Sequence, residues 1–121
     1  MLSRAIRGAS TLKTDTATEM REVVVELLEE MMRSNEVEID LISSIFFTAT
    51  TDIHSIFPAA AARELELSQV PLMCAQELEI EGSLKMAIRV LMTINTERKP
   101  SELKHIYLRG ATSLRPDLKS Q

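Results

Sequence analysis

The sequence predicts an α+β fold: a mixed β-sheet of about five strands that carries one long helix and short helical turns. One stretch, residues 16–35, has the apolar spacing of an amphipathic helix. Five shorter stretches are rich in strand-forming residues and are separated by turn signals. With 121 residues the chain has the size of one ordinary domain with one core, so we expect a single domain over residues 1–121.

The composition predicts an aliphatic core. Hydrophobic residues make up 45% of the chain but aromatic residues only 3%, and tryptophan is absent. Seven methionines suit irregular packing or a subunit interface. The net charge is −4, with acidic and basic residues interspersed and no run of lysine and arginine, so nucleic acid is not an expected partner.

The single cysteine excludes an internal disulfide and a multi-cysteine metal site within one chain, and it predicts a reducing compartment. The first residues lack the apolar region of a signal peptide, and no apolar stretch reaches the ~18 residues of a membrane span. We therefore expect a cytoplasmic protein with no membrane contact.

The first strand and the long helix are predicted from the first third of the chain. Residues 2–9 alternate loosely and predict a strand. Thr16 and Glu19 have the spacing of a capping box, in which each side chain can bond the other's free backbone N–H. The helix should end near residues 34–35. Its buried stripe is Met20, Val23, Val24, Leu27, Leu28 and Met31.

Four more strands and two short helical segments are predicted downstream. Pro58 opens a helix over residues 59–65, because a proline in the first turn has no N–H to leave unsatisfied. A helical turn is predicted over residues 100–102, and Pro116 ends regular structure. The apolar run of residues 87–95 fits a buried helix or a strand buried on both faces, and its β-branched residues favour the strand. The predicted strands are residues 41–50, 70–74, 87–95 and 105–109.

Several catalytic motifs are absent from the sequence. Three glycines allow no dinucleotide or Walker phosphate loop, and neither G-x-S-x-G nor H-E-x-x-H occurs. Asp52 and His54 have the spacing of a metal site or a catalytic dyad, but a turn aspartate and a surface histidine are the commoner explanation. Cys74 could act as a nucleophile, although no cationic neighbour is evident to lower its pKa; a small buried or hydrogen-bonding cysteine is the commoner alternative.

Arginines occupy positions in which a guanidinium is costly to bury. Arg89 lies inside the apolar run, so it either reaches solvent at a sheet edge or faces an anion. Arg7 lies between two alanines on its strand face, which leave space for a ligand, and an exposed strand arginine is the alternative. Arg115 by itself fits a surface charge in the tail, and Tyr107, the only tyrosine, fits a partly buried packing residue.

Six stretches of the chain together suggest a family. They are RAIRGA at residues 4–9, TATTDIHSIFPA at 48–59, VPLMCAQE at 70–77, IRV at 88–90, HIYL at 105–108 and LRPDL at 114–118. In this order, and over essentially the whole chain, they resemble the AroH class of chorismate mutases. No single stretch is decisive, but six in one order are a strong signal.

The resemblance implies a fold, an assembly and an activity. It implies a pseudo-barrel homotrimer with one mixed sheet per subunit and three active sites at the subunit interfaces, each lined by two chains. It further implies the rearrangement of chorismate to prephenate in phenylalanine and tyrosine biosynthesis, with no cofactor, no metal and no covalent intermediate.

The resemblance also assigns roles to individual residues. Arg89 matches the arginine that contacts the ether oxygen and a carboxylate, and Arg7 with Tyr107 matches the positions that hold a carboxylate. Glu77 and Cys74 match the groups near the ring hydroxyl. We expect Arg89, Glu77 and Arg7 to be the catalytic residues. The remaining substrate-binding positions implied are the wall residues Phe57, Ala59, Met73 and Leu114, and Arg115, which helps to close the site.

The chain departs from some relatives of this family at two positions. Ala60 stands where some carry a lysine, and Met73 where some carry a threonine, so two polar groups of those relatives are absent here.

Three other functions fit parts of the sequence. A small trimeric imine or enamine deaminase can use a similar packing and an interface arginine, but it leaves Glu77 unexplained. A ligand-binding or regulatory trimer would hold an aromatic precursor without turning it over. A purely structural oligomer gives no reason for Arg7 and Arg89 on strand faces.

Overall fold

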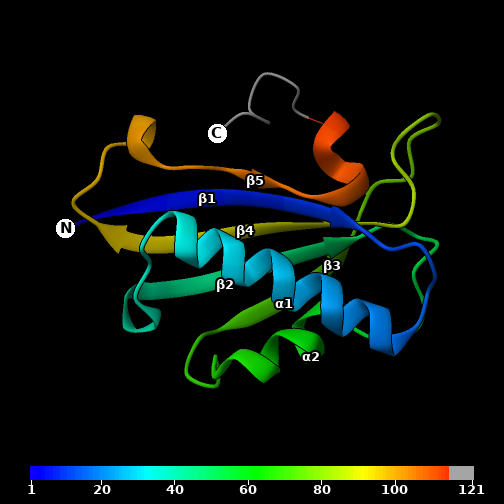
Figure 1. Cartoon of the computed structure of the whole chain (residues 1–121), viewed down its shortest axis with the longest axis horizontal. Helices are drawn as coiled ribbons and strands as arrows, with labels where there is room; N and C mark the ends of the chain where they lie inside the picture. The colour runs from blue at the N-terminus through cyan, green and yellow to red at the C-terminus, as the bar shows by residue number, and fades with distance from the viewer. Residues whose placement is uncertain (115–121) are drawn as a thin grey trace.

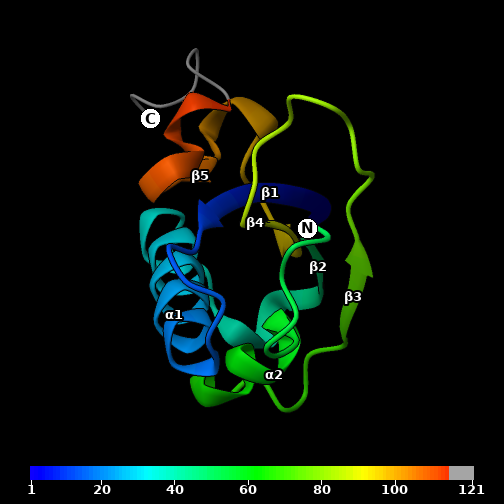
Figure 2. The same ribbon diagram turned by 90° about the vertical axis from the view of Figure 1, so that its right-hand side faces the viewer.

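A computed structural model describes residues 1–114 and consists of one five-stranded mixed sheet with two helices on one of its faces (Figures 1 and 2). The strand order is β3-β2-β4-β1-β5. The predicted mixed sheet with one long helix is thereby confirmed. The elements are β1 (Leu2–Thr11), α1 (Ala17–Ser34), β2 (Ile42–Ala49), α2 (Pro58–Ala62), β3 (Leu72–Gln76), β4 (Ala87–Thr96) and β5 (Ile106–Tyr107).

The sheet mixes two kinds of strand pairing. The central strand β4 is antiparallel to both of its neighbours, β1 and β2, whereas the edge strands β3 and β5 run parallel to β2 and β1. The edge pairs are short, since β5 contributes two residues and β3 five. The parallel edges therefore have few ladder hydrogen bonds of their own.

The helix α1 begins and ends where its local sequence predicts. The Thr16 hydroxyl accepts a hydrogen bond from the Glu19 N–H at 3.1 Å, which is one half of the predicted capping box. The other half differs, because the Glu19 carboxylate bonds the backbone N–H groups of Lys13 and Thr14 instead of that of Thr16. Glu19 thus fixes the loop before the helix. All six residues of the predicted stripe are buried.

Close packing of α1 against β1 depends on Gly8. A Cβ at this position would collide with the sulfur of Met31 and would lie 3.3 Å from Cδ1 of Leu27. The glycine therefore lets the helix approach the strand immediately beside Arg7. The core between the sheet and α1 is aliphatic and rich in methionine, as the composition predicts, and Met20, Met31 and Met92 are fully buried in it.

Three predicted strands have different ends in the structure. The first, predicted over residues 2–9, continues to Thr11 alongside β4. The third strand begins at Leu72 instead of Val70, because Val70 closes a turn onto Leu67 and Pro71 has no N–H to donate to a ladder. It continues to Gln76 because its partner β2 continues alongside. The fifth strand ends at Tyr107, not at 109.

The early end of β5 has a local cause. Arg109 adopts a left-handed conformation with φ 51°, which turns the chain into a 3₁₀ segment, Arg109–Ser113. The predicted helix over 59–65 likewise divides into α2 and a 3₁₀ turn, Arg63–Leu65. The predicted strand over 87–95 and the turn over 100–102 are confirmed. Within residues 1–114, no helix combines the length and the hydropathy that a membrane span requires.

Candidate active site

The sheet face opposite the helices carries four predicted site residues that lie on strands, Arg7, Met73, Arg89 and Tyr107. Side chains alternate along each strand, so Arg7 on β1 and Arg89 on β4 point away from the buried face. The register aligns Thr48, Arg89, Ala9 and Tyr107 in one row across the sheet. The neighbouring row contains Met73, Phe46, Leu91 and Arg7. The apolar members of this second row are exposed, by 64% for Met73, 37% for Phe46 and 42% for Leu91.

Arg89 and Glu77 form an ion pair on this face. Nε of Arg89 lies 3.0 Å from Oε2 of Glu77, and the Thr48 hydroxyl donates a hydrogen bond to the same oxygen. The backbone N–H of Glu77 bonds Ala49 O at 2.9 Å, so the carboxylate is held beside the end of β2. The Arg89 side chain is 44% exposed, whereas that of Glu77 is only 17% exposed.

The position of Arg89 fits parts of both predicted alternatives, contact with solvent at a sheet edge and contact with an anion. Arg89 does not lie at a sheet edge, because β4 is the central strand. It faces an anion, Glu77, and it also reaches solvent from the open face of the sheet. The expectation that β4 is buried on both faces is wrong for the single chain. On the row that faces away from the helices, Ala87 is buried, but Arg89, Leu91 and Asn95 are exposed.

Arg7 is exposed on β1, and within residues 1–114 no ion pair involves its guanidinium. Its backbone N–H donates to Nδ1 of His105 at 2.9 Å. Of the two alanines beside it, Ala5 is exposed but Ala9 is 1% exposed. The expected space for a ligand therefore exists on the Ala5 side, and neighbouring groups fill it on the Ala9 side.

Tyr107 lies at the opposite edge of the sheet from β3. It is half-buried on β5, opposite Ala9, and the Leu108 N–H bonds Ala9 O at 3.0 Å. Leu114 follows the 3₁₀ segment and is also half-buried. Arg115 lies outside the described residues.

The predicted wall residues differ in exposure. Phe57 precedes α2 and is 71% exposed, whereas Ala59 is 8% exposed and packs in the core. The Cys74 side chain points to the helix side of the sheet, because its partner on β2 is the fully buried Phe47. Burial raises the pKa of the Cys74 thiol, while a backbone hydrogen bond with Ala59 lowers it in part. The nucleophile alternative is therefore disfavoured, since an activated thiol needs a lowered pKa.

Two hollows on the surface contain neither Arg7 nor Arg89. One, of about 520 Å³, lies beside β3 and is bounded by Phe57 and Cys74 among others. A larger one, of about 1020 Å³, follows the solvent side of α1 and contains no predicted site residue. The predicted residues of the single chain thus form an open surface with one hollow at its β3 end.

The Asp52 and His54 pair fits the structural explanation. The Asp52 carboxylate accepts hydrogen bonds from the Thr50 hydroxyl at 2.5 Å and from the Met86 N–H at 3.0 Å. The backbone N–H of His54 bonds Asp15 at 2.7 Å. Across residues 1–114, no three His, Cys, Asp or Glu side chains gather in the manner of a metal site.

Comparison with known proteins matches the geometry to a family. The family model described as chorismate mutase type I matches residues 3–118. This chain belongs to the chorismate mutase type I family. The match contains all six stretches that carry the resemblance in full.

Named members of the chorismate mutase family align with nearly the whole chain. Chorismate mutase AroH of Bacillus subtilis is 40% identical over 119 residues, which cover 98% of this chain and 94% of that protein. Chorismate mutase AroH of Thermus thermophilus is 42% identical over 118 residues, with 97% of both chains covered. A solved structure of a chorismate mutase from Clostridium thermocellum has a TM-score of 0.89 and 44% identity, and covers 91% of this chain and 98% of that one.

In this chorismate mutase type I chain, the predicted residues form two groups at opposite edges of the sheet. Phe57, Met73 and Cys74 lie at the β3 edge, and the Arg89 guanidinium is drawn toward that edge by Glu77. The second group lies on β1, on β5 and after β5, and consists of Arg7, Tyr107 and Leu114.

Sequence reasoning missed two residues of the site. Thr48 bonds the catalytic carboxylate candidate Glu77, and His105 accepts from the backbone of Arg7. Both lie in stretches that resemble the family, but neither contact can be read from the sequence. Each depends on which strands become neighbours in the sheet.

Proposed function

We propose that this chain catalyses the rearrangement of chorismate to prephenate, the step that leads toward phenylalanine and tyrosine. The observation that carries the proposal is the Arg89–Glu77 pair on the open sheet face of a chain from the chorismate mutase type I family. Its relatives from B. subtilis and T. thermophilus bear the name chorismate mutase and align over nearly their whole length.

The reaction is an intramolecular Claisen rearrangement. One carbon–oxygen ether bond breaks while one carbon–carbon bond forms, so no proton acceptor, nucleophile or external electron is required. The flexible dianionic substrate must be held in a compact chair that brings the two reacting carbons together. Arginines suit this task because a guanidinium offers paired donors to a carboxylate in a fixed plane.

Arg89 is assigned to the ether oxygen. Negative charge grows on this oxygen as the bond stretches, so a fixed cationic donor binds the transition state more tightly than the ground state. The 3.0 Å contact with Glu77 supports this role, because it fixes the direction of the guanidinium before substrate arrives.

Glu77 is assigned to the ring hydroxyl. Within residues 1–114, the contacts from Arg89 and Thr48 both end on Oε2, so Oε1 is the oxygen that we assign to the substrate. A hydrogen bond from the ring hydroxyl to Oε1 would orient the ring with respect to Arg89. Cys74 is also assigned to a position near the ring hydroxyl. Because its thiol faces α2, the backbone of Cys74 is the part that would contact the substrate.

Each site is assigned to two subunits of a homotrimer. The β3 and β5 edges are separated by four strand spacings, about 19 Å. A single six-membered ring with short carboxylate-bearing groups is much shorter, so one substrate cannot touch Met73 and Tyr107 of the same chain. The Phe57, Met73, Glu77 and Arg89 group of one subunit would therefore face the Arg7, Tyr107 and Leu114 group of its neighbour. Exposed Phe46 and Leu91 on the same sheet face support burial against another chain.

Within this arrangement, Arg7 and Tyr107 hold a substrate carboxylate. The exposure of Arg7 supports its role, since its guanidinium has no ion-pair partner within residues 1–114. Phe57, Ala59, Met73 and Leu114 form the wall, with Ala59 contributing from beneath Phe57. Arg115 would close the site from the tail.

The activity is tested by following the loss of chorismate absorbance with purified protein and by identifying prephenate as the product. Saturable turnover without added metal or cofactor is the expected result. Tight chorismate binding without prephenate would favour a binding protein instead. Release of ammonia from a reactive enamine would favour a deaminase.

The shared site is tested by mixing two inactive variants. Arg7→Ala and Arg89→Ala subunits are unfolded together and refolded, so that mixed trimers form. If each site takes Arg89 from one subunit and Arg7 from its neighbour, about a quarter of the sites contain both arginines and activity returns. If both arginines serve one site from one chain, no mixed site contains both and activity stays absent. Each variant refolded alone is the control.

A further inference from the structure

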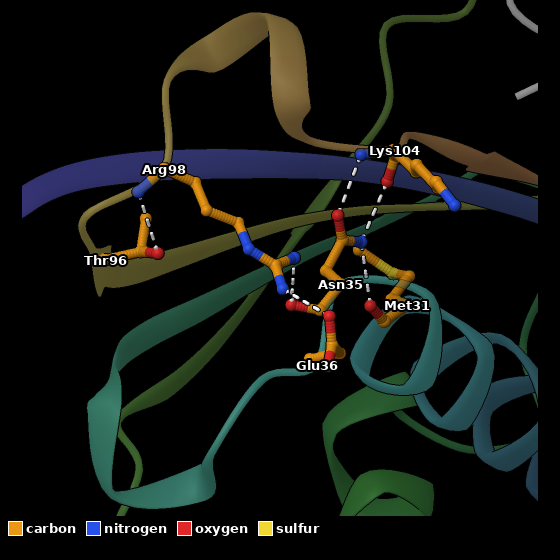
Figure 3. Close-up of polar contacts among 6 residues, drawn as sticks. All are labelled: Met31, Asn35, Glu36, Thr96, Arg98 and Lys104. Atoms are coloured by element: carbon orange, nitrogen blue, oxygen red, sulfur yellow. Dashed lines mark hydrogen bonds and ion pairs between the residues drawn. The ribbon is translucent and has the colours of Figure 1, made fainter.

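Asn35 joins the end of α1 to the segment that precedes β5. It is the C-cap residue of α1 and is 3% exposed. Its Nδ2 donates to Met31 O and to Lys104 O, both at 2.9 Å, and its Oδ1 accepts from the Lys104 N–H at 2.7 Å. Figure 3 shows the amide between the helix end and Lys104. Both donor hydrogens of the side chain are therefore in use.

The two bonds to Lys104 resemble the pairing of neighbouring strands. One side-chain amide satisfies both the N–H and the C=O of Lys104, as a residue of an adjacent strand would do. Lys104 lies three residues before Tyr107. The approach of the chain to β5 is thus fixed by α1 at Lys104, in addition to the contact of β1 with His105.

β5 has few backbone bonds to hold it in register, although the side chains of Leu103 and Ile106 are buried in the core. It pairs with β1 only through Ile106 and Tyr107, and the flanking bonds are those from Arg7 N–H to His105 and from Leu108 N–H to Ala9. A two-residue parallel edge strand has few bonds with which to resist displacement. The position of Tyr107 therefore depends on anchors outside the ladder.

Arg98 contacts the other side of the same corner. Its Nη1 donates to Asn35 O at 2.7 Å and its Nη2 to Glu36 Oε1 at 2.6 Å (Figure 3). These bonds stabilise the end of α1, but they do not reach Lys104. Removal of the Arg98 side chain should therefore weaken the corner without releasing the segment that leads to β5.

We infer that Asn35 is a positioning residue for Tyr107: by fixing the backbone of Lys104 to the end of α1, its amide sets where β5 meets β1. The inference rests on the proposed function, in which Tyr107 holds a substrate carboxylate. Such a contact is made in both the ground state and the transition state, so its loss should raise KM and leave kcat nearly unchanged.

The experiment compares Asn35→Ala with Arg98→Met and Asn35→Asp in the full-length enzyme. Asn35→Ala should raise KM for chorismate about tenfold, because a displacement on the order of 1 Å at a binding residue is enough for such a loss. Arg98→Met should keep KM within about twofold of the wild-type value, even if it lowers the melting temperature as much as Asn35→Ala does. Asn35→Asp keeps an oxygen that can accept from the Lys104 N–H. It replaces the donor Nδ2 with a second oxygen, which would repel the carbonyl oxygens of Met31 and Lys104. The KM of this variant should therefore rise as in Asn35→Ala.

A spectroscopic signal reports directly on Tyr107. The chain has one tyrosine and no tryptophan, so tyrosine fluorescence anisotropy and the near-ultraviolet circular dichroism of tyrosine come from this residue alone. Asn35→Ala should lower the anisotropy and weaken the dichroism, and Arg98→Met should change neither. This measurement needs no substrate and remains decisive if the Asn35 variants turn over poorly.

The decisive comparison adds Tyr107→Phe, which removes the hydroxyl. If Asn35 acts through Tyr107, Asn35→Ala raises KM no further in the Tyr107→Phe background. Equal KM changes for Asn35→Ala and Arg98→Met, unchanged tyrosine signals, or additive effects with Tyr107→Phe would overturn the inference alone. A wild-type KM in Tyr107→Phe would overturn the substrate contact of Tyr107, and the inference with it.

Discussion

Nε of Arg89 lies 3.0 Å from Oε2 of Glu77, although Arg89 is on the central strand and Glu77 follows an edge strand. The two side chains therefore meet over β2, which lies between their strands. Thr48, which is opposite Arg89 on β2, bonds the same oxygen and closes a triad. The guanidinium is thus oriented within one subunit, independently of substrate.

The first prediction concerns Arg89. Arg89→Ala should lower kcat by ~10² to 10³, the usual effect of removing one donor to a developing oxyanion. Initial rates at saturating chorismate measure this loss. Arg98→Met is the matched control, because it removes a half-buried, hydrogen-bonded arginine that lies away from the candidate site. A loss of tenfold or less would sink the role assigned to Arg89.

The second prediction concerns the pH dependence of turnover. The rearrangement transfers no proton, so kcat should be nearly constant between about pH 6 and 9. The Cys74 thiol does not complicate this range, since burial raises its pKa from the ordinary value of 9.0 and keeps it protonated. Steady-state kinetics in overlapping buffers would test it, and a steep bell-shaped profile would indicate different chemistry.

The third prediction concerns Asp52 and stability. Burial raises the pKa of Asp52, but the Thr50 hydroxyl and the Met86 N–H outweigh burial and hold it below the ordinary 3.8. A lowered pKa in the folded state means that the charged carboxylate stabilises the fold above about pH 4 and that this contribution is lost as pH falls through the folded pKa.

Asp52→Asn should accordingly lower the free energy of unfolding at pH 7 by about 1.5–3 kcal/mol, the range for hydrogen bonds to a charged group. Urea denaturation at several pH values would measure the difference between variant and wild type. The difference should shrink below pH 4, and a constant difference down to pH 2 would contradict the explanation.

The fourth prediction concerns Gly8. Gly8→Ala should destabilise the protein by about 1–3 kcal/mol, because the added methyl group must displace the Met31 side chain in a closely packed core. Gly82→Ala is the control, since nothing lies near its Cβ position, although its φ of 82° adds a local strain of its own. Melting temperatures from thermal unfolding would measure both losses of stability. A higher melting temperature on adding Met31→Leu to Gly8→Ala would support the collision, whereas no increase would argue against it.

The parts of the fold that could be predicted from sequence are those with local causes. Thr16, Glu19 and the apolar stripe specify α1 almost to the residue, because caps and helical periodicity act within a few positions. The ends of β1, β3 and β5 differ from the predicted ends by two residues, since a strand ends where its partner or a backbone turn ends it. The left-handed Arg109 is such a turn, and nothing in its residue type predicts it.

The same division holds for the candidate site. An arginine within an apolar strand was visible in the sequence, but its partner Glu77 and the bridging Thr48 were brought there by sheet pairing. The side to which Cys74 points was also hidden, because it depends on the register with Phe47. The sequence could therefore predict which residues belong to the candidate site. How their side chains are oriented relative to one another could be seen only once the strand order and register were known.

The strand order also bears on how the chain acquires its structure during synthesis. β1 is made before the other strands, but its neighbours in the sheet, β4 and β5, come later in the chain. Leu2 therefore cannot pair with Thr96 until most of the chain has been made. Until then α1 can form locally, but the first strand has no ladder to join, and such distant pairings slow folding. Arg7, on the first of the five strands to be made, is therefore one of the last sheet residues to reach its final place, and a ribosome-bound chain truncated before β4 should still lack a protected β1.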